Sequence, residues 1–397
     1  MPLITLPPKL YPLCQAIKDA NGRAYLAGGI VRDSVLGVAS KDIDLEIHDI
    51  EQQALVRILY RFGKPNFVGQ SFPVWILRLD NHHIDISLTD AESTKEACRR
   101  RDLRINAMLY DPLTDEIVDP FGGMEDIQNK QLTATDPLCF AEDPLRVLRV
   151  AQFSARFQFE IATSLRELCL QLPLQQLPEE RILLEFEKAW LKPTKPSIAF
   201  QELVRLRVIE KYFGAWPGLD ERAILEGLDR GKRYCTEHNG WNMALFWGIS
   251  LHRCTKEESE HILDRLQIYS YLNYPIRKGV LASLHCSPRL MEEDSSLLRN
   301  QCAEYFFLHF LCTIAMSIQP DGCGQVNLEK ATLSGIANSP LPRLIQGRDI
   351  LPFGLKGREI GRCLSFIRER ELDETIQNRA QGLAAVAKWL HKQKEKR

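Results

Sequence analysis

Acidic side chains in the N-terminal part of the chain have the spacing expected of metal ligands. Asp42 and Asp44 occur in the segment KDIDLE, where side chains two residues apart point to the same face of a strand. Two such carboxylates can hold a pair of Mg²⁺ ions for phosphoryl transfer. Asp85, in the later segment HIDISL, is a candidate third ligand. Taken alone, alternating Asp residues are more often a solvated strand face, and Asp85 could equally be a solvent-facing residue on an edge strand.

A glycine pair precedes these carboxylates. Gly28 and Gly29 follow a buried strand that ends at 25–27, and they precede a helix predicted over 30–36. Glycine lets a phosphate approach the backbone closely, and the free N–H groups at the start of a helix favour anions. Arg32, in the first turn of that helix, could grip a phosphate with two hydrogen bonds. A glycine pair alone is weak evidence, but joined to Arg32 and the acidic pair it predicts a triphosphate site.

Two further clusters carry charges that could bind a nucleotide. In RRDLRINA, Arg101 could pair with a phosphate, and Asp102 could accept a hydrogen bond from a ribose 2′-hydroxyl. In EDPLRVLR, Asp143 is predicted to be the N-cap of a helix, with Arg146 one turn later. An acceptor beside donors matches the base edges of cytosine and adenine, whereas guanine and uracil offer the reverse pattern. The plainer alternatives are a solvated charge run and a capping Asp in an i,i+3 ion pair.

In this order, the motifs resemble those of the class II nucleotidyltransferases, the family of tRNA CCA-adding enzymes and bacterial poly(A) polymerases. The resemblance implies that Asp42, Asp44 and Asp85 are catalytic, with Mg²⁺ held by Asp42 and Asp44. It also implies a larger set of nucleotide-binding residues: Gly28, Gly29, Arg32, Arg101, Asp102, Asn106, Asp143, Arg146 and Arg149. Asn106 is carried by the family's RRDxxxNA motif, and Arg149 by its EDxxRxxR motif, where it would support the base-reading pair or touch the phosphates.

The elements around these motifs predict an α+β fold. Strands and helices alternate in the N-terminal part, which predicts a nucleotidyltransferase palm with a mixed sheet, and the rest of the chain follows a helical apolar pattern. Helices are predicted over 10–19, 51–62, 199–212 and 372–391, with a linker over 340–352. By the family resemblance, the chain divides into a head (1–138), a helical neck with the base-reading helix (139–200), a helical body (201–338) and a helical, tRNA-binding tail (339–397).

Composition narrows the class of protein further. A net charge of −1 over 397 residues gives no global attraction to nucleic acid, so an RNA-binding surface must come from local clusters. The eleven cysteines form no CxxC pairs and indicate small buried side chains in a reducing compartment. The N-terminus lacks the pattern of a signal peptide, and the apolar stretch 305–318 is too short to span a bilayer. The sequence therefore predicts a cytoplasmic protein without a membrane partner.

The expected activity is addition of nucleotides from CTP and ATP to the 3′ end of tRNA, with contacts to the acceptor and elbow regions. Between Asp85 and Arg100 the chain is shorter than in full CCA-adding relatives, and Thr89–Asp90 stands where they carry a basic residue. In the family, loss of this loop goes with addition of C but not of the terminal A. We therefore expect CC addition, with complete CCA addition as the close alternative. A poly(A) polymerase is a further alternative, and a non-catalytic RNA-binding protein is a remote one.

Overall fold

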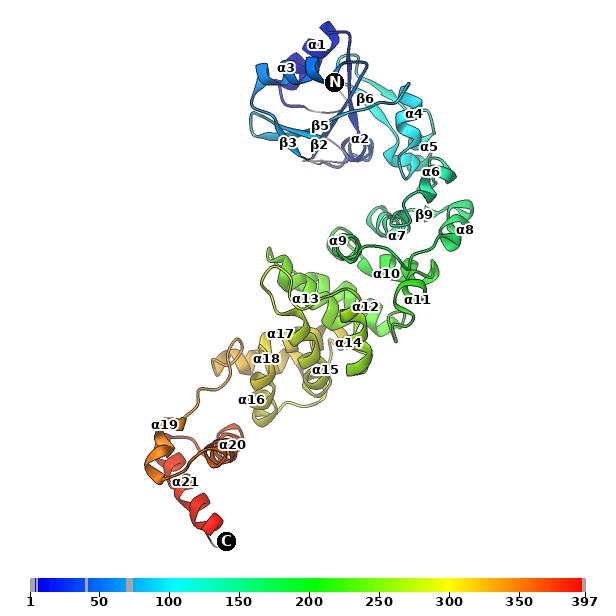
Figure 1. The fold of residues 1–397 in the computed structure, drawn as a ribbon. Helices are drawn as coiled ribbons and strands as arrows, with labels where there is room; N and C mark the ends of the chain where they lie inside the picture. The colour runs from blue at the N-terminus through cyan, green and yellow to red at the C-terminus, as the bar shows by residue number, and fades with distance from the viewer. Residues whose placement is uncertain (1–3, 5, 40–41, 69–73, 395–397) are drawn as a thin grey trace. The chain divides into compact units, whose positions relative to one another are not determined.

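The structure is a computed structural model that describes residues 4, 6–39, 42–68 and 74–394 (Figure 1). The chain forms two compact units. The first contains Met1–Glu185 with Arg205–Tyr212, and the second contains Phe186–Val204 with Phe213–Arg397.

A seven-stranded mixed sheet forms the centre of the first unit, as the sequence predicts. Its strands are β1 (Arg23–Ala27), β2 (Ile43–His48), β3 (Asn66–Val68), β4 (Val74–Leu79), β5 (His82–Leu88), β6 (Leu109–Asp111) and β7 (Glu116–Val118). The order across the sheet is β3-β4-β5-β2-β1-β6-β7. Only the central β2–β5 pair is parallel among these described strands; the other neighbours run antiparallel. Two strands that are distant in sequence, each with a candidate Asp, therefore lie side by side.

Short helices cover this sheet. They are α1 (Leu10–Asp19), α2 (Gly29–Val35), α3 (Gln52–Phe62), α4 (Thr94–Arg99), the 3₁₀ turn η1 (Arg104–Asn106) and α5 (Gly123–Gln128). The helix predicted over 10–19 is observed as α1, and Leu10, Leu13 and Ile17 on one of its faces are completely buried. This helix packs against β1 and α3. Residues 69–73, between β3 and β4, lie outside the described part.

The helices after the sheet begin with α6 (Pro137–Ala141), α7 (Arg146–Phe157) and α8 (Thr163–Gln171), and a small parallel pair joins β8 (Gln131–Leu132) to β9 (Glu160–Ile161). The predicted N-cap at Asp143 is wrong. The helix α7 begins at Arg146, and the carboxylate of Asp143 instead accepts a hydrogen bond from the backbone N–H of Leu145 in the preceding turn, at 3.3 Å.

The predicted helix over 199–212 is interrupted. The structure has α9 (Glu179–Leu191), α10 (Pro196–Arg205) and α11 (Val208–Phe213). Arg207 lies between the last two helices with φ of 58°, a left-handed conformation that ends a right-handed helix.

The second unit is helical throughout its described part. It contains α12 (Arg222–Gly231), the 3₁₀ turn η2 (Lys232–Tyr234), α13 (Asn239–Ser250), α14 (Lys256–Arg265), α15 (Ile276–Glu292), α16 (Ser296–Tyr305), α17 (Leu308–Ile318) and α18 (Gly324–Leu333). Its core includes a group of stacked and edge-on aromatic rings from Phe186, Trp190, Phe200, Phe246 and Trp247.

No single helix in the described part of the chain is long and apolar enough to cross a membrane. Within that part, only α16 and α17 taken together have the length and apolar composition of a membrane span, and these two helices meet at a bend of 111°.

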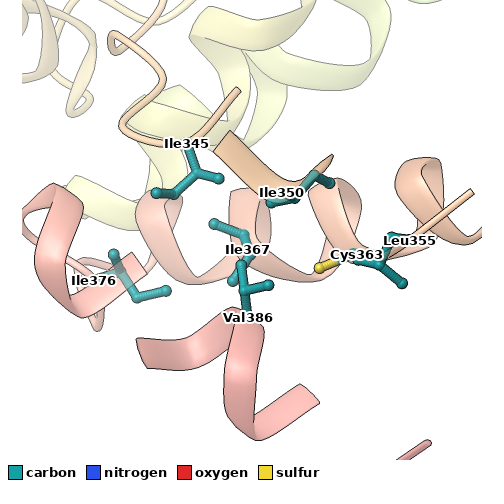
Figure 2. Close-up of a cluster of buried hydrophobic side chains, with 7 residues drawn as sticks. All are labelled: Ile345, Ile350, Leu355, Cys363, Ile367, Ile376 and Val386. Atoms are coloured by element: carbon teal, nitrogen blue, oxygen red, sulfur yellow. The ribbon is translucent and has the colours of Figure 1, made fainter. Parts of the chain in front are cut away.

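The C-terminal helices have a hydrophobic core of their own (Figure 2). They are α19 (Gly347–Ile350), the 3₁₀ turn η3 (Leu351–Phe353), α20 (Arg358–Leu372) and α21 (Arg379–Lys394). The core consists of the buried residues Ile345, Ile350, Leu355, Cys363, Ile367, Ile376 and Val386. Two predictions are wrong here: the expected linker over 340–352 contains α19, and the expected helix over 372–391 is interrupted between α20 and α21, where Glu374 has φ of 61°.

Candidate active site

The candidate metal ligands converge on the parallel pair at the centre of the sheet. Asp44 of β2 and Asp85 of β5 are direct register partners. Both side chains are exposed, whereas their strand neighbours Ile43 and Ile84 are buried on the other face. Partial burial, together with the nearby charges of Asp85 and Asp42, raises the pKa of Asp44 above its usual value. Asp42 and Asp85 are therefore close enough to act on the charge of Asp44, and the three carboxylates form one acidic group.

Mg²⁺ prefers carboxylate oxygens, so the donor type of this acidic group fits the ion that the sequence predicts. The pKa of Asp44 is raised first by partial burial and then by the neighbouring carboxylates, and a bound cation would stabilise its ionised form. Within the described ranges, however, no three His, Cys, Asp or Glu side chains are already arranged to hold a metal ion. Mg²⁺ is commonly held by one or two carboxylates together with water and substrate phosphates, so a complete set of three protein ligands is not needed.

The glycine turn begins at the end of β1, next to β2 in the sheet. Gly28 has φ of 68° and ψ of −123°, a conformation that strains any other residue, and α2 starts at Gly29. A Cβ atom built on Gly28 would lie 3.0 Å from Nη1 of Arg101, and one on Gly29 would lie 3.6 Å from Nη2 of Arg32. The turn is therefore flanked by two guanidinium groups.

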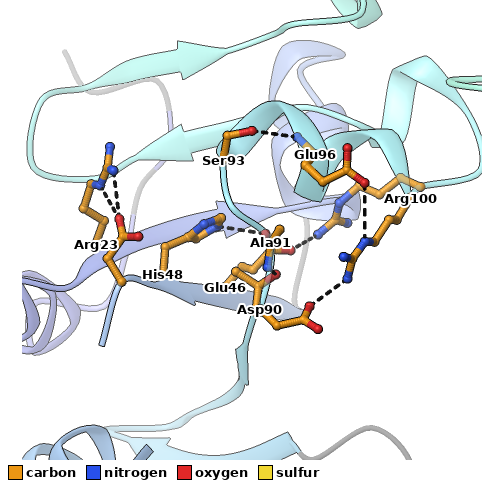
Figure 3. Close-up of polar contacts among 11 residues, drawn as sticks. Arg23, Glu46, His48, Asp90, Ala91, Ser93, Glu96 and Arg100 are labelled. Atoms are coloured by element: carbon orange, nitrogen blue, oxygen red, sulfur yellow. Dashed lines mark hydrogen bonds and ion pairs between the residues drawn. The ribbon is translucent and has the colours of Figure 1, made fainter. Parts of the chain in front are cut away.

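Arg101 is held by a carboxylate that sequence analysis did not assign to the site. Its Nη2 donates to Oε2 of Glu46 at 2.6 Å. The other oxygen of Glu46, Oε1, lies 3.0 Å from Nε2 of His48, a contact that Figure 3 shows. Burial acts to raise the pKa of Glu46, but His48 and Arg101 together lower it below its usual value. The signal for Glu46 was present in KDIDLE, because it has the same strand parity as Asp42 and Asp44.

Arg32, Asn106, Asp102 and Arg149 form one chain of buried and partly buried hydrogen bonds. Nη1 of Arg32 donates to Oδ1 of Asn106 at 2.5 Å, and Nδ2 of Asn106 donates to Oδ1 of Asp102 at 2.9 Å. Nε of Arg149 donates to the other oxygen of Asp102 at 2.8 Å. Burial acts to raise the pKa of Asp102, but Arg149, Asn106 and the Leu103 backbone lower it overall. The structure thus joins four predicted nucleotide-binding residues into one network that links α2 to α7.

Aromatic rings and a second ion pair support this network. The guanidinium of Arg32 lies over the ring of Phe153 at 5.3 Å, and that of Arg149 lies over the same ring at the same distance. Asp33 accepts hydrogen bonds from Arg32 at 2.8 Å and from Arg156 at 3.0 Å. The sequence alone gave no reason to pair Asp33 with Arg156, because the two are 123 positions apart.

The two predicted base-reading residues each have a partner of their own. Oδ2 of Asp143 accepts from Nη2 of Arg181 at 2.7 Å. Arg146 donates to the main-chain carbonyls of Cys139 and Arg100, at 2.5 and 2.9 Å. The i,i+3 ion pair, the plainer alternative for this motif, is therefore not what these side chains form in the described structure.

The short interval after Asp85 is tightly connected. The backbone N–H of Thr89 donates to the carbonyl of Ile47 at 2.9 Å, and Asp90 pairs with Arg100 at 2.7 Å (Figure 3). Ser93 then caps α4 by accepting from the N–H of Glu96 at 3.2 Å. This segment leads directly from β5 to the arginine cluster.

Comparison with known proteins agrees with this architecture. Residues 24–133, which carry the glycine turn, the acidic group and Arg101, match the family described as the poly(A) polymerase head domain. The multifunctional CCA protein of Pasteurella multocida is 34% identical over 238 residues, which cover 54% of this chain and 53% of that protein. Over these residues the chain is similar to tRNA nucleotidyltransferases and poly(A) polymerases.

A second relative, the multifunctional CCA protein of Haemophilus influenzae, is 35% identical over 214 residues, or 48% of this chain and 50% of that protein. The chain therefore spans about half the length of these two relatives.

Solved structures of CCA-adding enzymes have the same fold over nearly the whole chain. The CCA-adding enzyme of Bacillus stearothermophilus in complex with CTP superposes with a TM-score of 0.75 at 18% identity, covering 99% of this chain and 100% of that one. The Thermotoga maritima CCA-adding enzyme complexed with tRNA superposes with a TM-score of 0.67 at 23% identity, covering 97% of this chain and 96% of that one. At these identities the likeness establishes the fold.

Proposed function

We propose that this protein is a tRNA nucleotidyltransferase that adds cytidine nucleotides from CTP to the 3′ end of tRNA without a nucleic-acid template. The observation that carries the proposal is the in-register pair Asp44 and Asp85 beside the Gly28–Gly29 turn. Binding of RNA alone does not need juxtaposed carboxylates, whereas nucleotidyl transfer needs them for its metal ions.

In this mechanism the glycine turn and its two flanking arginines form the triphosphate site. The turn exposes backbone to the phosphates, Arg101 supplies positive charge, and Arg32 holds α2 in place through its buried contacts. Asp42, Asp44 and Asp85 would hold Mg²⁺, which supplies activation of the attacking 3′-hydroxyl and neutralises charge on the leaving pyrophosphate when it is bound. The network of Asp102, Asn106 and Arg149 orients α7 relative to the turn.

Selection of the base is assigned to Asp143 and Arg146. The carboxylate of Asp143 is 31% exposed and can accept a hydrogen bond from an exocyclic amine after Arg181 releases it. Arg146 is anchored by two main-chain carbonyls, so its position is fixed before a nucleotide binds. An acceptor beside donors favours cytosine and adenine.

The segment after β5 supports CC addition in preference to complete CCA addition. Changing one pocket from CTP to ATP requires a mobile lever, and the interval from Thr89 to Ser93 is held at both ends by the contacts to Ile47 and Glu96. The helical regions after residue 138 would bind tRNA through its shape and phosphates, with neck, body and tail divided at residues 200 and 338.

The deciding experiment supplies purified protein with tRNA that lacks its 3′ end. We expect extension with CTP alone, no further extension when ATP is added, and little A addition to tRNA that already ends in CC. Efficient A addition to that last substrate would instead establish complete CCA addition. Preferential extension of generic RNA with ATP would establish a poly(A) polymerase, and the absence of any incorporation would reject the enzyme assignment.

A further inference from the structure

The orientation of Arg101 depends on one carboxylate. Its Nη2 is bound by Glu46 at 2.6 Å, and its Nη1 lies at the Gly28 turn, where a Cβ would come within 3.0 Å. Its Nε is buried and has no hydrogen-bond partner among the described residues. The Arg101 side chain nevertheless remains 26% exposed. Glu46 therefore holds one side of the Arg101 guanidinium, and another part of the side chain is accessible to solvent.

Glu46 is itself fixed in place. Its second carboxylate oxygen contacts Nε2 of His48 at 3.0 Å, so both oxygens are engaged. His48 is only 3% exposed, and its ring meets the ring of Tyr25 edge-on at a centroid distance of 5.3 Å. Tyr25 is in turn the register partner of Glu46 across β1 and β2. The carboxylate therefore has little freedom to rotate, and it can act as a rigid anchor.

The position of Glu46 also connects Arg101 to the acidic group. Glu46 lies two residues after Asp44 on β2, so both side chains leave the strand on the same side. The positive charge of Arg101 lowers the pKa of Asp44, against the effect of burial and of Asp85. An ion pair of low exposure adds little net stability, because desolvation offsets the attraction between its charges. The main physical effect of the Glu46–Arg101 ion pair is to fix the position of the guanidinium.

We propose that Glu46 is a positioning residue that holds Arg101 against the Gly28 turn, in the orientation that binds the triphosphate of the incoming nucleotide. This inference rests on the proposed nucleotidyl transfer and adds a residue to it. Glu46 acts through Arg101 and does not touch the nucleotide. The opposite role, in which Glu46 competes with phosphate for Arg101, predicts the opposite change in nucleotide affinity when its charge is removed.

The test compares Glu46→Gln with Glu96→Gln. Gln is isosteric with Glu, and Glu96 offers a matched control because it forms looser ion pairs at 3.7 and 3.8 Å with Arg99 and Arg100. With CTP and tRNA lacking its 3′ end, we expect Glu46→Gln to raise the KM for CTP about tenfold and to change kcat less than about twofold. Glu96→Gln is expected to leave both constants unchanged.

A double variant separates positioning from a general structural effect. If Glu46 acts through the guanidinium, Glu46→Gln combined with Arg101→Lys should raise the KM for CTP no further than Arg101→Lys alone. Additive effects, an unchanged KM for Glu46→Gln, or a KM that falls would each overturn the inference. If Glu46→Gln does not fold, as judged by thermal unfolding, Glu46→Asp replaces it. That variant keeps the charge but shortens the reach, so its KM for CTP should also rise, and an unchanged KM would count against the inference.

The wild-type protein distinguishes this inference from the proposed function. If it extends tRNA and Glu46→Gln has the wild-type KM, only the positioning role fails. If it extends no RNA but binds CTP with Mg²⁺ in calorimetry, the transfer activity fails, and the ratio of the two proteins' Kd values for CTP decides the positioning role. If it does neither, both fail.

Discussion

Asp44 and Asp85 lie directly opposite each other on the parallel strands β2 and β5, although 41 positions separate them in the chain. Two carboxylates in this relationship repel each other, which is one reason that the pKa of Asp44 is raised. The arrangement costs stability when both groups are ionised, and a bound cation would remove that cost.

Replacing Asp44 should therefore separate activity from stability. We expect Asp44→Asn to reduce nucleotide incorporation by about a hundredfold or more, because a metal ligand is lost. Its Tm should stay equal to that of the wild type or rise, because a like-charge repulsion is removed. Asp80→Asn, which breaks an exposed pair with Lys9 in the same unit, is the control and should retain activity. Survival of incorporation in Asp44→Asn would show that the metal assignment is wrong.

The buried carboxylate of Asp102 should make stability depend on pH. Its folded pKa is lowered from the usual 3.8 by Arg149, Asn106 and the Leu103 backbone, which outweigh burial. A lowered pKa in an acid stabilises the fold at pH values above its unfolded pKa, and that stability is lost as the pH falls through the folded pKa. Asp102→Asn should thus destabilise the protein by about 1.5–3 kcal/mol at pH 7.

Thermal unfolding at several pH values checks whether Asp102 makes stability depend on pH. The difference in Tm between wild type and Asp102→Asn should shrink as the pH falls below about 5. A difference that stays constant down to the lowest accessible pH would mean that the ionised carboxylate contributes nothing to the network.

Asp143 should control which base is accepted. Removing its carboxylate takes away the acceptor for an exocyclic amine, so Asp143→Ala should lower the preference for CTP over UTP, measured as the ratio of kcat/KM values, by about tenfold. Glu142→Ala removes the exposed neighbouring carboxylate and should leave that ratio unchanged. Equal losses of kcat/KM for both nucleotides in Asp143→Ala would assign it a structural role through Arg181.

We expect the C-terminal core to contribute to binding of full-length tRNA and not to the nucleotidyl-transfer step. Ile367 is 1% exposed within the cluster shown in Figure 2. Ile367→Ala should destabilise these helices by about 2–5 kcal/mol. We expect a higher KM for full-length tRNA and an unchanged KM for a minihelix containing only the acceptor and T arms. Leu351→Ala, at a position that is 57% exposed, is the control. Equal effects on both RNAs would argue against a tRNA-binding role for the tail.

The sequence alone determined the local features of this protein. The alternation in KDIDLE placed Asp42, Asp44 and Glu46 on one strand face, and the glycine pair marked the turn before α2, because strand parity and glycine backbone geometry depend only on neighbouring residues. The apolar period of α1 likewise specified its buried face. Helix ends were harder to predict, since Arg207 and Glu374 adopt left-handed conformations that their residue types do not favour.

Only the tertiary structure decided which charges meet. The parallel pairing of β2 with β5 brought Asp85 to Asp44, and the packing of α7 near α2 and η1 gave Asp102 and Asp33 their arginine partners. The tertiary structure also pairs Arg101 with Glu46, and it places Arg146 within hydrogen-bonding distance of main-chain carbonyls. The physical reason is that an ion pair forms between whichever opposite charges the fold brings within a few ångströms, and that proximity is set by long-range packing, which the spacing of residues along the chain does not encode.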